Sequence, residues 1–84
     1  MTSLWKYVLN QTSVEALLTA RVGQRNRLIH FLLALTNDPY KEGDFSAQDE
    51  VGRTVQIKVV GAYMVTYWSD HPVREVRVVN IERI

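Results

Sequence analysis

The sequence has 84 residues, a formal net charge of +1 and no cysteine. A chain of this length builds one domain, which we expect to span residues 1–84. The absence of cysteine excludes disulfide bonds and thiolate metal sites within the chain. A net charge near zero argues against a nucleic-acid binder that relies on overall charge, although basic side chains can still gather on one face. No stretch has the length and apolarity of a transmembrane helix, and the N-terminus lacks a signal-peptide pattern, so we expect a cytoplasmic protein.

The first part of the chain predicts a strand and two helices. Residues 4–9 combine Trp, Tyr, Val and Leu, which indicates an edge strand. Thr12-Ser13-Val14-Glu15 has the spacing of a capping box and predicts the start of a short helix, which Gly23 is expected to end. A longer helix is predicted from Gln24 to Thr36, because apolar side chains recur there at helical spacing: Leu28, Ile29, Leu32, Leu33 and Leu35.

Charged residues are unevenly spread over the next segments. Arginines crowd the start of the longer helix, where the ordinary expectation is a solvated face: Arg21, Arg25 and Arg27. Asn37-Asp38-Pro39 is expected to stop that helix, because the residue before a proline disfavours the helical conformation. The stretch from Tyr40 to Val51 is polar and acidic and shows no period, so we expect a loop that crosses back to the sheet.

The stretch from Gly52 to Ile81 predicts three strands in an antiparallel meander. Apolar and polar side chains alternate over residues 54–59, which predicts one buried face formed by Val55, Ile57 and Val59. Gly61 permits a tight reversal. Two further strands are expected on either side of a turn: Ala62–Trp68, the turn Ser69-Asp70-His71-Pro72, and Val73–Ile81.

These elements predict an α+β fold in the order β-α-α-β-β-β. A hairpin of two helices is expected to pack on one face of a four-stranded antiparallel sheet. The opposite face is then open to water or to a partner. Gln56 and Lys58 lie on the side of their strand away from Val55, so we expect them on that open face.

Cations and aromatic rings on the open face of a sheet are typical of single-stranded RNA binding. Either Tyr63, Val65 and Tyr67 or Met64, Thr66 and Trp68 share the side of Lys58, and the sequence leaves this open. The alternative is that the aromatic rings belong to the core or to cross-strand pairs, because aromatic side chains dominate small cores. Arg53 and Lys58 are then ordinary solvated residues at the sheet surface.

The Asp70-His71 pair allows two interpretations. A carboxylate next to an imidazole suits a general base, whereas Asp-His-Pro at a hairpin tip is also ordinary turn chemistry. His30 is expected at the helix surface, since no second histidine lies four residues away. The sequence contains no Ser-His-Asp grouping, glycine-rich phosphate loop or metal-ligand spacing, so we expect neither a metal nor another cofactor.

Several short segments, in this order along the chain, resemble the RelE/ParE toxin superfamily, and in particular its compact RelE-like members. They are Leu35 to Pro39 (L-x-x-D-P), Gly52-Arg53, Val55-Gln56-Ile57-Lys58-Val59, Gly61-Ala62-Tyr63, Tyr67 and the strand Val73–Ile81. The resemblance covers essentially the whole chain, including the order of its elements. It implies the toxin of a type II toxin–antitoxin system, held inactive by a small antitoxin protein in a hetero-oligomer.

The resemblance also implies candidate site residues. RelE-type toxins cleave messenger RNA on the ribosome with basic residues on the open sheet face, which implies catalytic roles for Lys58 and Arg83. The reaction also needs a base, for which His71 or a tyrosine is the candidate. Residues implied in binding RNA or another target are Arg53, Gln56, Lys58, Arg74 and Arg77. The pattern also departs from the family: its first strand lysine falls on Gln56, an arginine falls on Met64, and its C-terminal tyrosine has no counterpart in this sequence.

Whether the chain is an enzyme is therefore open at the level of sequence. The first hypothesis is a toxin that acts by binding macromolecules, namely its antitoxin and the ribosome or DNA gyrase. The second is a ribosome-dependent endoribonuclease, or mRNA interferase. The alternatives are a gyrase inhibitor like ParE, which is not a nuclease, and a protein-interaction module of the same fold without toxicity.

Overall fold

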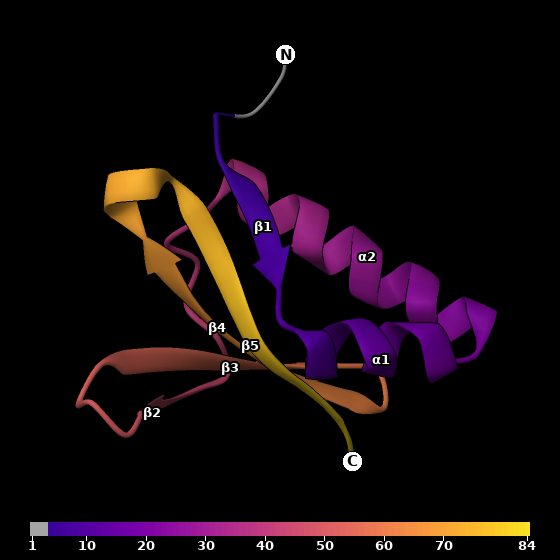
Figure 1. The fold of residues 1–84 in the computed structure, drawn as a ribbon. Helices are drawn as coiled ribbons and strands as arrows, with labels where there is room; N and C mark the ends of the chain where they lie inside the picture. Colours follow the sequence, from indigo (N-terminus) through magenta and orange to yellow (C-terminus); the bar gives the residue numbers. More distant parts are fainter. Residues whose placement is uncertain (1–3) are drawn as a thin grey trace.

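A computed structural model describes residues 4–84 as a five-stranded β-sheet with two α-helices packed on one face (Figure 1). The α+β fold with a helix pair on a sheet is therefore confirmed. Residues 1–3, which begin the predicted domain, lie outside the described part. The elements in chain order are β1 (Lys6–Leu9), α1 (Gln11–Thr19), α2 (Val22–Asn37), β2 (Phe45–Gln48), β3 (Thr54–Val60), β4 (Tyr63–Asp70), a short 3₁₀ turn (His71–Val73) and β5 (Glu75–Arg83).

The sheet differs from the prediction in two respects, since it has five strands instead of four and is mixed instead of antiparallel. Its strand order is β1-β5-β4-β3-β2. β1 pairs with β5 in parallel, from Lys6 opposite Glu75 to Leu9 opposite Val78. A parallel partner needs a long crossover, and the two helices and the β2–β4 region lie between these strands in the chain.

The additional strand, β2, lies within the stretch that was expected to be a loop. All four of its residues are exposed, so no alternation of apolar and polar side chains marks it in the sequence. It pairs antiparallel with β3, with Phe45 opposite Ile57. The connection is fastened by Asp49, whose carboxylate accepts hydrogen bonds from the backbone N–H groups of Val51 and Arg53 at 3.1 and 2.8 Å.

The helix boundaries also correct the sequence interpretation. Asn10, not Thr12, caps α1, and its side-chain oxygen accepts a hydrogen bond from the Ser13 backbone N–H at 2.9 Å. Gly23 does not end a helix but lies in the first turn of α2. The actual break at residues 20–21 is held by Arg25, whose guanidinium donates hydrogen bonds to the carbonyls of Leu17, Leu18 and Ala20, near the C-terminal end of α1.

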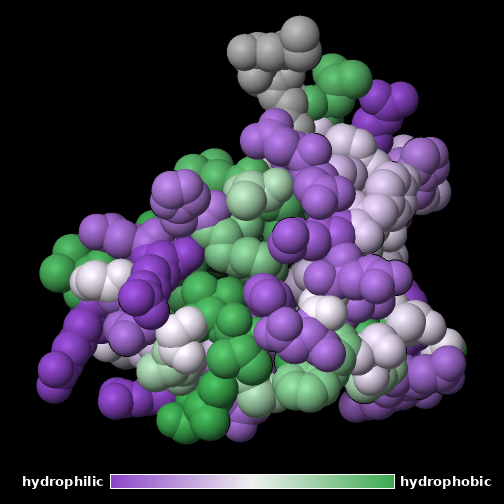
Figure 2. Space-filling model, turned by 180° about the vertical axis from the view of Figure 1, so that it is seen from behind, coloured by the Kyte–Doolittle hydropathy of each residue, from purple (hydrophilic) through white to green (hydrophobic). Residues whose placement is uncertain are grey.

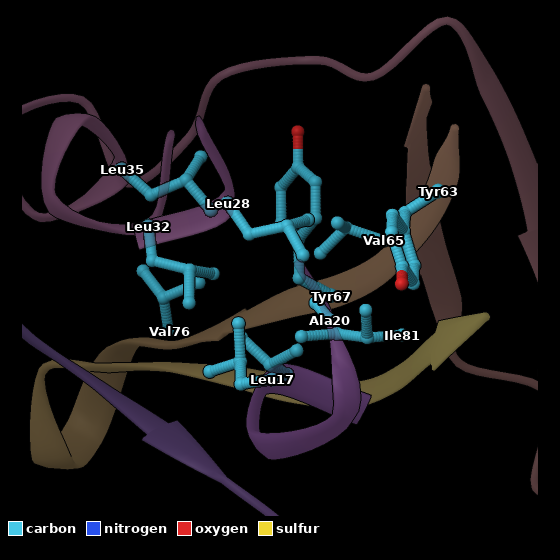
Figure 3. Close-up of a cluster of buried hydrophobic side chains, with 11 residues drawn as sticks. Leu17, Ala20, Leu28, Leu32, Leu35, Tyr63, Val65, Tyr67, Val76 and Ile81 are labelled. Carbon is cyan, nitrogen blue, oxygen red and sulfur yellow. The ribbon is translucent and has the colours of Figure 1, made fainter. Parts of the chain in front are cut away.

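The hydrophobic core lies between the helices and the three strands β1, β5 and β4. Its buried members are Leu17, Ala20, Leu28, Leu32, Leu35, Tyr63, Val65, Tyr67, Val76, Val78 and Ile81. Figure 3 shows the aliphatic side chains around the ring of Tyr67, whose hydroxyl points out of the cluster. The helical stripe predicted for α2 is confirmed for Leu28, Leu32 and Leu35, whereas Leu33 is 51% exposed.

Adjacent leucines of α2 provide a test of this core. Leu32 is fully buried, so we expect Leu32→Ala to lower the free energy of unfolding by about 2–5 kcal/mol, since it removes buried methyl groups and leaves a cavity. Leu33→Ala, the matched control on the exposed side, is expected to change it by less than about 0.5 kcal/mol. Urea unfolding of both variants measures the difference, and equal effects would contradict the orientation of α2.

Candidate functional site

Strand pairing determines which face each side chain of β3 occupies. Lys58 lies opposite Val65 and Gln56 lies opposite Tyr67, and both partners are buried under the helices. Directly paired residues in a sheet point to the same face. Lys58 and Gln56 therefore lie on the helix side of the sheet, and the expectation that they lie on the open face is wrong. The predicted buried set on the same strand faces away from the helices, and within it Val55 is buried as predicted whereas Val59 is 37% exposed.

The reason is that residues 39–44, which we call the covering segment, run over the helix side of β3 and β4 and replace a helix there. Gly43 lies directly on β3, because a Cβ atom at this position would come within 2.4 Å of the Ile57 carbonyl oxygen. Its backbone N–H donates a hydrogen bond to the Gln56 side chain at 2.9 Å. The hydroxyl of Tyr67 donates to the Lys41 carbonyl at 2.9 Å. Polar side chains on this side of the sheet thus form hydrogen bonds with the backbone of the covering segment.

Asp44 binds the candidate catalytic Lys58 at the end of the covering segment. One carboxylate oxygen of Asp44 lies 3.0 Å from Lys58 Nζ, and the other accepts a hydrogen bond from the Val59 backbone N–H at 2.9 Å. The Val59 N–H and the Lys58 ammonium lower the pKa of Asp44 below its usual value of 3.8. In this arrangement the ammonium of Lys58 is already paired with a carboxylate.

Tyr67 is the other titratable group under the covering segment. Burial of its ring, together with the negative charges of Asp44 and Asp38, raises the pKa of its hydroxyl from 10.0 to about 12. The folded protein therefore holds this proton more tightly than the unfolded chain does. The stability that this difference supplies is present in full below pH 10 and is lost as the pH rises from 10 towards 12.

The open face of the sheet carries apolar side chains at its centre. We call Phe45, Ile57, Val59 and Met64 the open-face patch, because Phe45 pairs with Ile57 and Val59 pairs with Met64. Phe45 is 57% exposed and Val59 is 37% exposed. Hydrophobic residues also reach the surface on the side seen from behind Figure 1, where they gather in a run with hydrophilic residues on both sides (Figure 2). Gathered exposed apolar residues mark interaction surfaces more often than scattered ones.

Two of the predicted target-binding arginines meet over Trp68 on this open face. The guanidinium carbon of Arg53 lies 3.8 Å from the centre of the Trp68 ring, and that of Arg77 lies 6.0 Å from it. Both cations are paired: Arg53 with Asp49 at 2.8 Å, and Arg77 with Asp70 and Glu75 at 2.9 and 3.0 Å. The basic character expected for this end of the sheet is therefore largely balanced by carboxylates.

Arg83 reaches the helix side of the sheet through an irregularity in β5. Thr66 pairs with Asn80 but Tyr67 pairs with Val78, so Val79 is an extra residue in the ladder. Beyond this bulge the side-chain alternation is inverted, and Arg83 faces the helix side opposite Tyr63. A regular alternation from Val76 would place Arg83 on the other face, and nothing in the sequence marks the bulge.

His71 lies at the opposite end of β4 from Arg83, in the 3₁₀ turn before β5. Its Nδ1 atom is hydrogen bonded to the hydroxyl of Tyr40, and its ring lies 6.0 Å from that of Trp5. Arg74 follows in the left-handed conformation with φ 54°, is exposed, and accepts a backbone hydrogen bond from Lys6. A turn is thus present where one was expected, but it begins at His71, because Ser69 and Asp70 still belong to β4. His71 packs with aromatic side chains in this turn.

The structure therefore divides the predicted site residues among three places. Lys58 and Gln56 lie under the covering segment, Arg53 and Arg77 lie on the open face, and His71 and Arg74 lie at the β4–β5 turn. Arg83 shares the helix side with Lys58 but lies two strands away. Within residues 4–84 no three His, Asp or Glu side chains gather as metal ligands. None of the helices in this part of the chain has the length and apolarity to cross a membrane.

The fold resembles chains from two solved toxin–antitoxin structures. A chain of the archaeal RelE–RelB complex from Pyrococcus horikoshii OT3 matches with a TM-score of 0.77 and 13% identity, covering 94% of this chain and 93% of that one. A chain of the toxin–antitoxin complex RelBE2 from Mycobacterium tuberculosis matches with a TM-score of 0.77 and 15% identity, covering 95% and 98%. The predicted RelE-like fold is thereby confirmed. The sequence itself matches no family model and no curated protein sequence significantly.

The contact between Asp44 and Lys58 makes a testable contribution to stability. Because the pKa of Asp44 is lowered in the folded state, its stabilising effect is present above pH 3.8 and is lost as the pH falls through the folded-state value. We expect Asp44→Asn to unfold at lower urea concentration than the wild type at pH 7, with the difference shrinking below about pH 4.

Glu50→Gln is the control for this variant, because it removes an exposed carboxylate of the same acidic region. Urea unfolding at several pH values measures both. An Asp44→Asn variant whose midpoint equals that of the wild type at pH 7 would contradict the role of this carboxylate.

Proposed function

We propose that this chain is the toxin component of a type II toxin–antitoxin system, and that it acts in the cytoplasm by binding a macromolecular target. The fold likeness carries the proposal, because it extends over at least 93% of each chain compared and both matched chains come from toxin–antitoxin complexes. A cognate antitoxin protein is the partner that holds the toxin inactive.

The open-face patch is the surface proposed for the antitoxin. Phe45, Ile57, Val59 and Met64 offer apolar contact area on a rigid sheet, and a protein partner needs such buried anchors for tight binding. At one end of the patch the cations Arg53 and Arg77 flank Trp68. An antitoxin segment with apolar residues over the patch and polar residues towards these paired arginines fits this surface. The exposed edge of β2 is also suited to pairing with an extended segment.

The same arrangement favours binding over catalysis as the mode of action. Phosphodiester cleavage needs an acid, a base and cations arranged around one phosphate. His71, the candidate base, lies at the far end of β4 from Arg83, and the ammonium of Lys58 is paired with Asp44. Arg53, Gln56, Lys58, Arg74 and Arg77, the proposed target-binding residues, are likewise spread over separate surfaces and are suited to contacts with a large target.

A ribosome-dependent endoribonuclease is the second candidate function, and the placement of two cations favours it. Lys58 and Arg83 face the same side of the sheet, separated by two strand spacings across it and by two residues along β5, or about 12 Å. For them to act on one phosphate, Lys58 must leave Asp44 and the covering segment must move aside. His71 would then need a second rearrangement to approach the same phosphate.

Expression in a bacterial host tests the proposed toxin. We expect induction of the wild-type chain to arrest growth, and co-expression of the protein encoded by an adjacent reading frame to restore growth and to yield a purified complex. The double variant Val59→Glu/Met64→Glu places charges in the open-face patch. We expect it to lose the complex with the antitoxin, while it still arrests growth or at least remains folded. Leu18→Glu, an exposed apolar residue on α1, is the control that should retain the complex.

Two purified assays identify the target. Cleavage of mRNA in a translation reaction, lost in Lys58→Ala and Arg83→Ala, would establish the nuclease, whereas inhibited gyrase supercoiling would indicate a ParE-like action. Normal growth after induction of a folded wild-type chain would contradict the toxin and favour an interaction module of the same fold.

A further inference from the structure

A polar pocket lies where the turn between α1 and α2 meets the β3–β4 hairpin. It is lined by Thr19, Arg21, Gln24, Ala62, Tyr63 and Arg83 and has a volume of about 240 Å³. Figure 1 shows the C-terminal end of β5, the hairpin and α1 close together at this end of the molecule. The pocket lies on the helix side of the sheet, away from the open-face patch, and the proposed antitoxin contact does not involve it.

Two arginines, Arg21 and Arg83, line this pocket, and a third, Arg27, lies at the neighbouring β3–β4 hairpin, all without carboxylate partners. In the described residues, Arg21, Arg27 and Arg83 have no Asp or Glu oxygen within 4.0 Å. The cations that do form ion pairs lie elsewhere on the molecule: Arg53, Lys58 and Arg77. None of the residues that line the pocket is acidic. Arginines that gather without counter-charges repel one another, and an anion bound among them relieves that repulsion.

The start of α2 adds positive charge at the same place. Arg21 is the N-cap of α2, its side chain makes no capping hydrogen bond, and no acidic residue lies in the first turn. The N-terminal end of a helix carries a partial positive charge and favours anions, so Arg21 adds to the positive charge there instead of offsetting it. Arg25 of the same helix is instead used to bind the carbonyls of α1.

Gly61 brings the third arginine to the hairpin. A Cβ atom at Gly61 would lie 2.6 Å from Gln24 Oε1 and 3.2 Å from Arg27 Nη1, and the residue has a positive φ of 59°. The absence of a side chain therefore lets Gln24 and Arg27 approach the hairpin next to Ala62, which lines the pocket. Arg83 completes the group from β5, because the bulge at Val79 turns it to this face.

We propose that this pocket binds a phosphate group, held by Arg21 and Arg83, with Arg27 adding positive charge from the neighbouring hairpin. Guanidinium groups recognise phosphate through paired hydrogen bonds, and several of them around one anion are typical of phosphate recognition. The volume is below the range of about 300–1,000 Å³ that holds whole drug-sized ligands, which suits one phosphate group whose attached molecule extends outwards. The lining offers only Ala62 and the ring of Tyr63 as apolar contacts, so it lacks the anchors that a protein segment needs.

The phosphate can belong to a nucleic-acid strand or to a free phosphate compound, and the same protein sample distinguishes them. Isothermal titration of the full chain with inorganic phosphate, and fluorescence anisotropy with a labelled single-stranded RNA of twelve nucleotides, measure the two sources. We expect Arg21→Gln/Arg83→Gln to weaken binding at least about tenfold, as the loss of charge-assisted hydrogen bonds implies. Lys6→Gln/Lys41→Gln removes the same charge at exposed positions and should weaken binding less than about twofold.

The outcomes separate the possibilities. Weakened binding of both ligands in the arginine variant supports a phosphate site that accepts nucleic acid, and weakened binding of inorganic phosphate alone supports a site for free phosphate compounds. Equal losses in the arginine and lysine variants, or no binding of either ligand by the wild type, would overturn the proposal. So would competition by a glutamate oligopeptide of equal charge that is as strong as competition by phosphate. Circular dichroism and urea unfolding establish that each variant is folded, and growth arrest by the wild type is scored separately.

Discussion

The inward face of β4 determines how the rest of the molecule is arranged. Tyr63, Val65 and Tyr67 are all buried, and they bring the helices down onto the centre of the sheet. Pairing on one side of β4 then directs Gln56 and Lys58 towards the helices, and pairing on the other side directs Val78 and Arg83 the same way. The opposite faces of the same strands supply the exposed apolar side chains. The location of every candidate site residue on β3 and β5 follows from these pairs.

The two helices are narrower than the sheet, so they leave β3 uncovered on the helix side. The covering segment lies over this part of the sheet. β3 lies beyond the main core, where residues 39–44 take over from the helices. A backbone needs hydrogen-bond partners instead of apolar contacts, so polar side chains are suited to the covered side of β3. Gln56 and Asp44 supply such partners, and Lys58 is paired as a consequence. The apolar side chains of β3 therefore lie on the open face, where we propose that a protein partner covers them.

The elements that follow from a local sequence pattern could be predicted, whereas those that depend on contacts between residues distant in the chain were missed. The stripe of leucines in α2, the hairpin at Gly61 and the meander are local patterns, and the structure confirms them. The alternation on β3 is equally clear, but alternation defines two faces without saying which one the helices cover. β2 carries no pattern because all its residues are exposed, and the bulge at Val79 inverts the end of β5 without a glycine or proline to mark it.

The two proposed surfaces lie on opposite sides of the sheet and differ in chemistry. The open-face patch is apolar and suits a protein, whereas the arginine pocket is polar and suits a phosphate, so both can be occupied at once. The central claim is that a protein partner covers the open-face patch, and Met64 is a direct probe of it. The chain has two methionines, so a sample labelled at the methionine methyl groups gives a simple NMR spectrum in which Met64→Leu assigns the Met64 signal. Titration with the antitoxin should shift the Met64 signal, and a complex that forms while this signal stays unchanged would contradict the account.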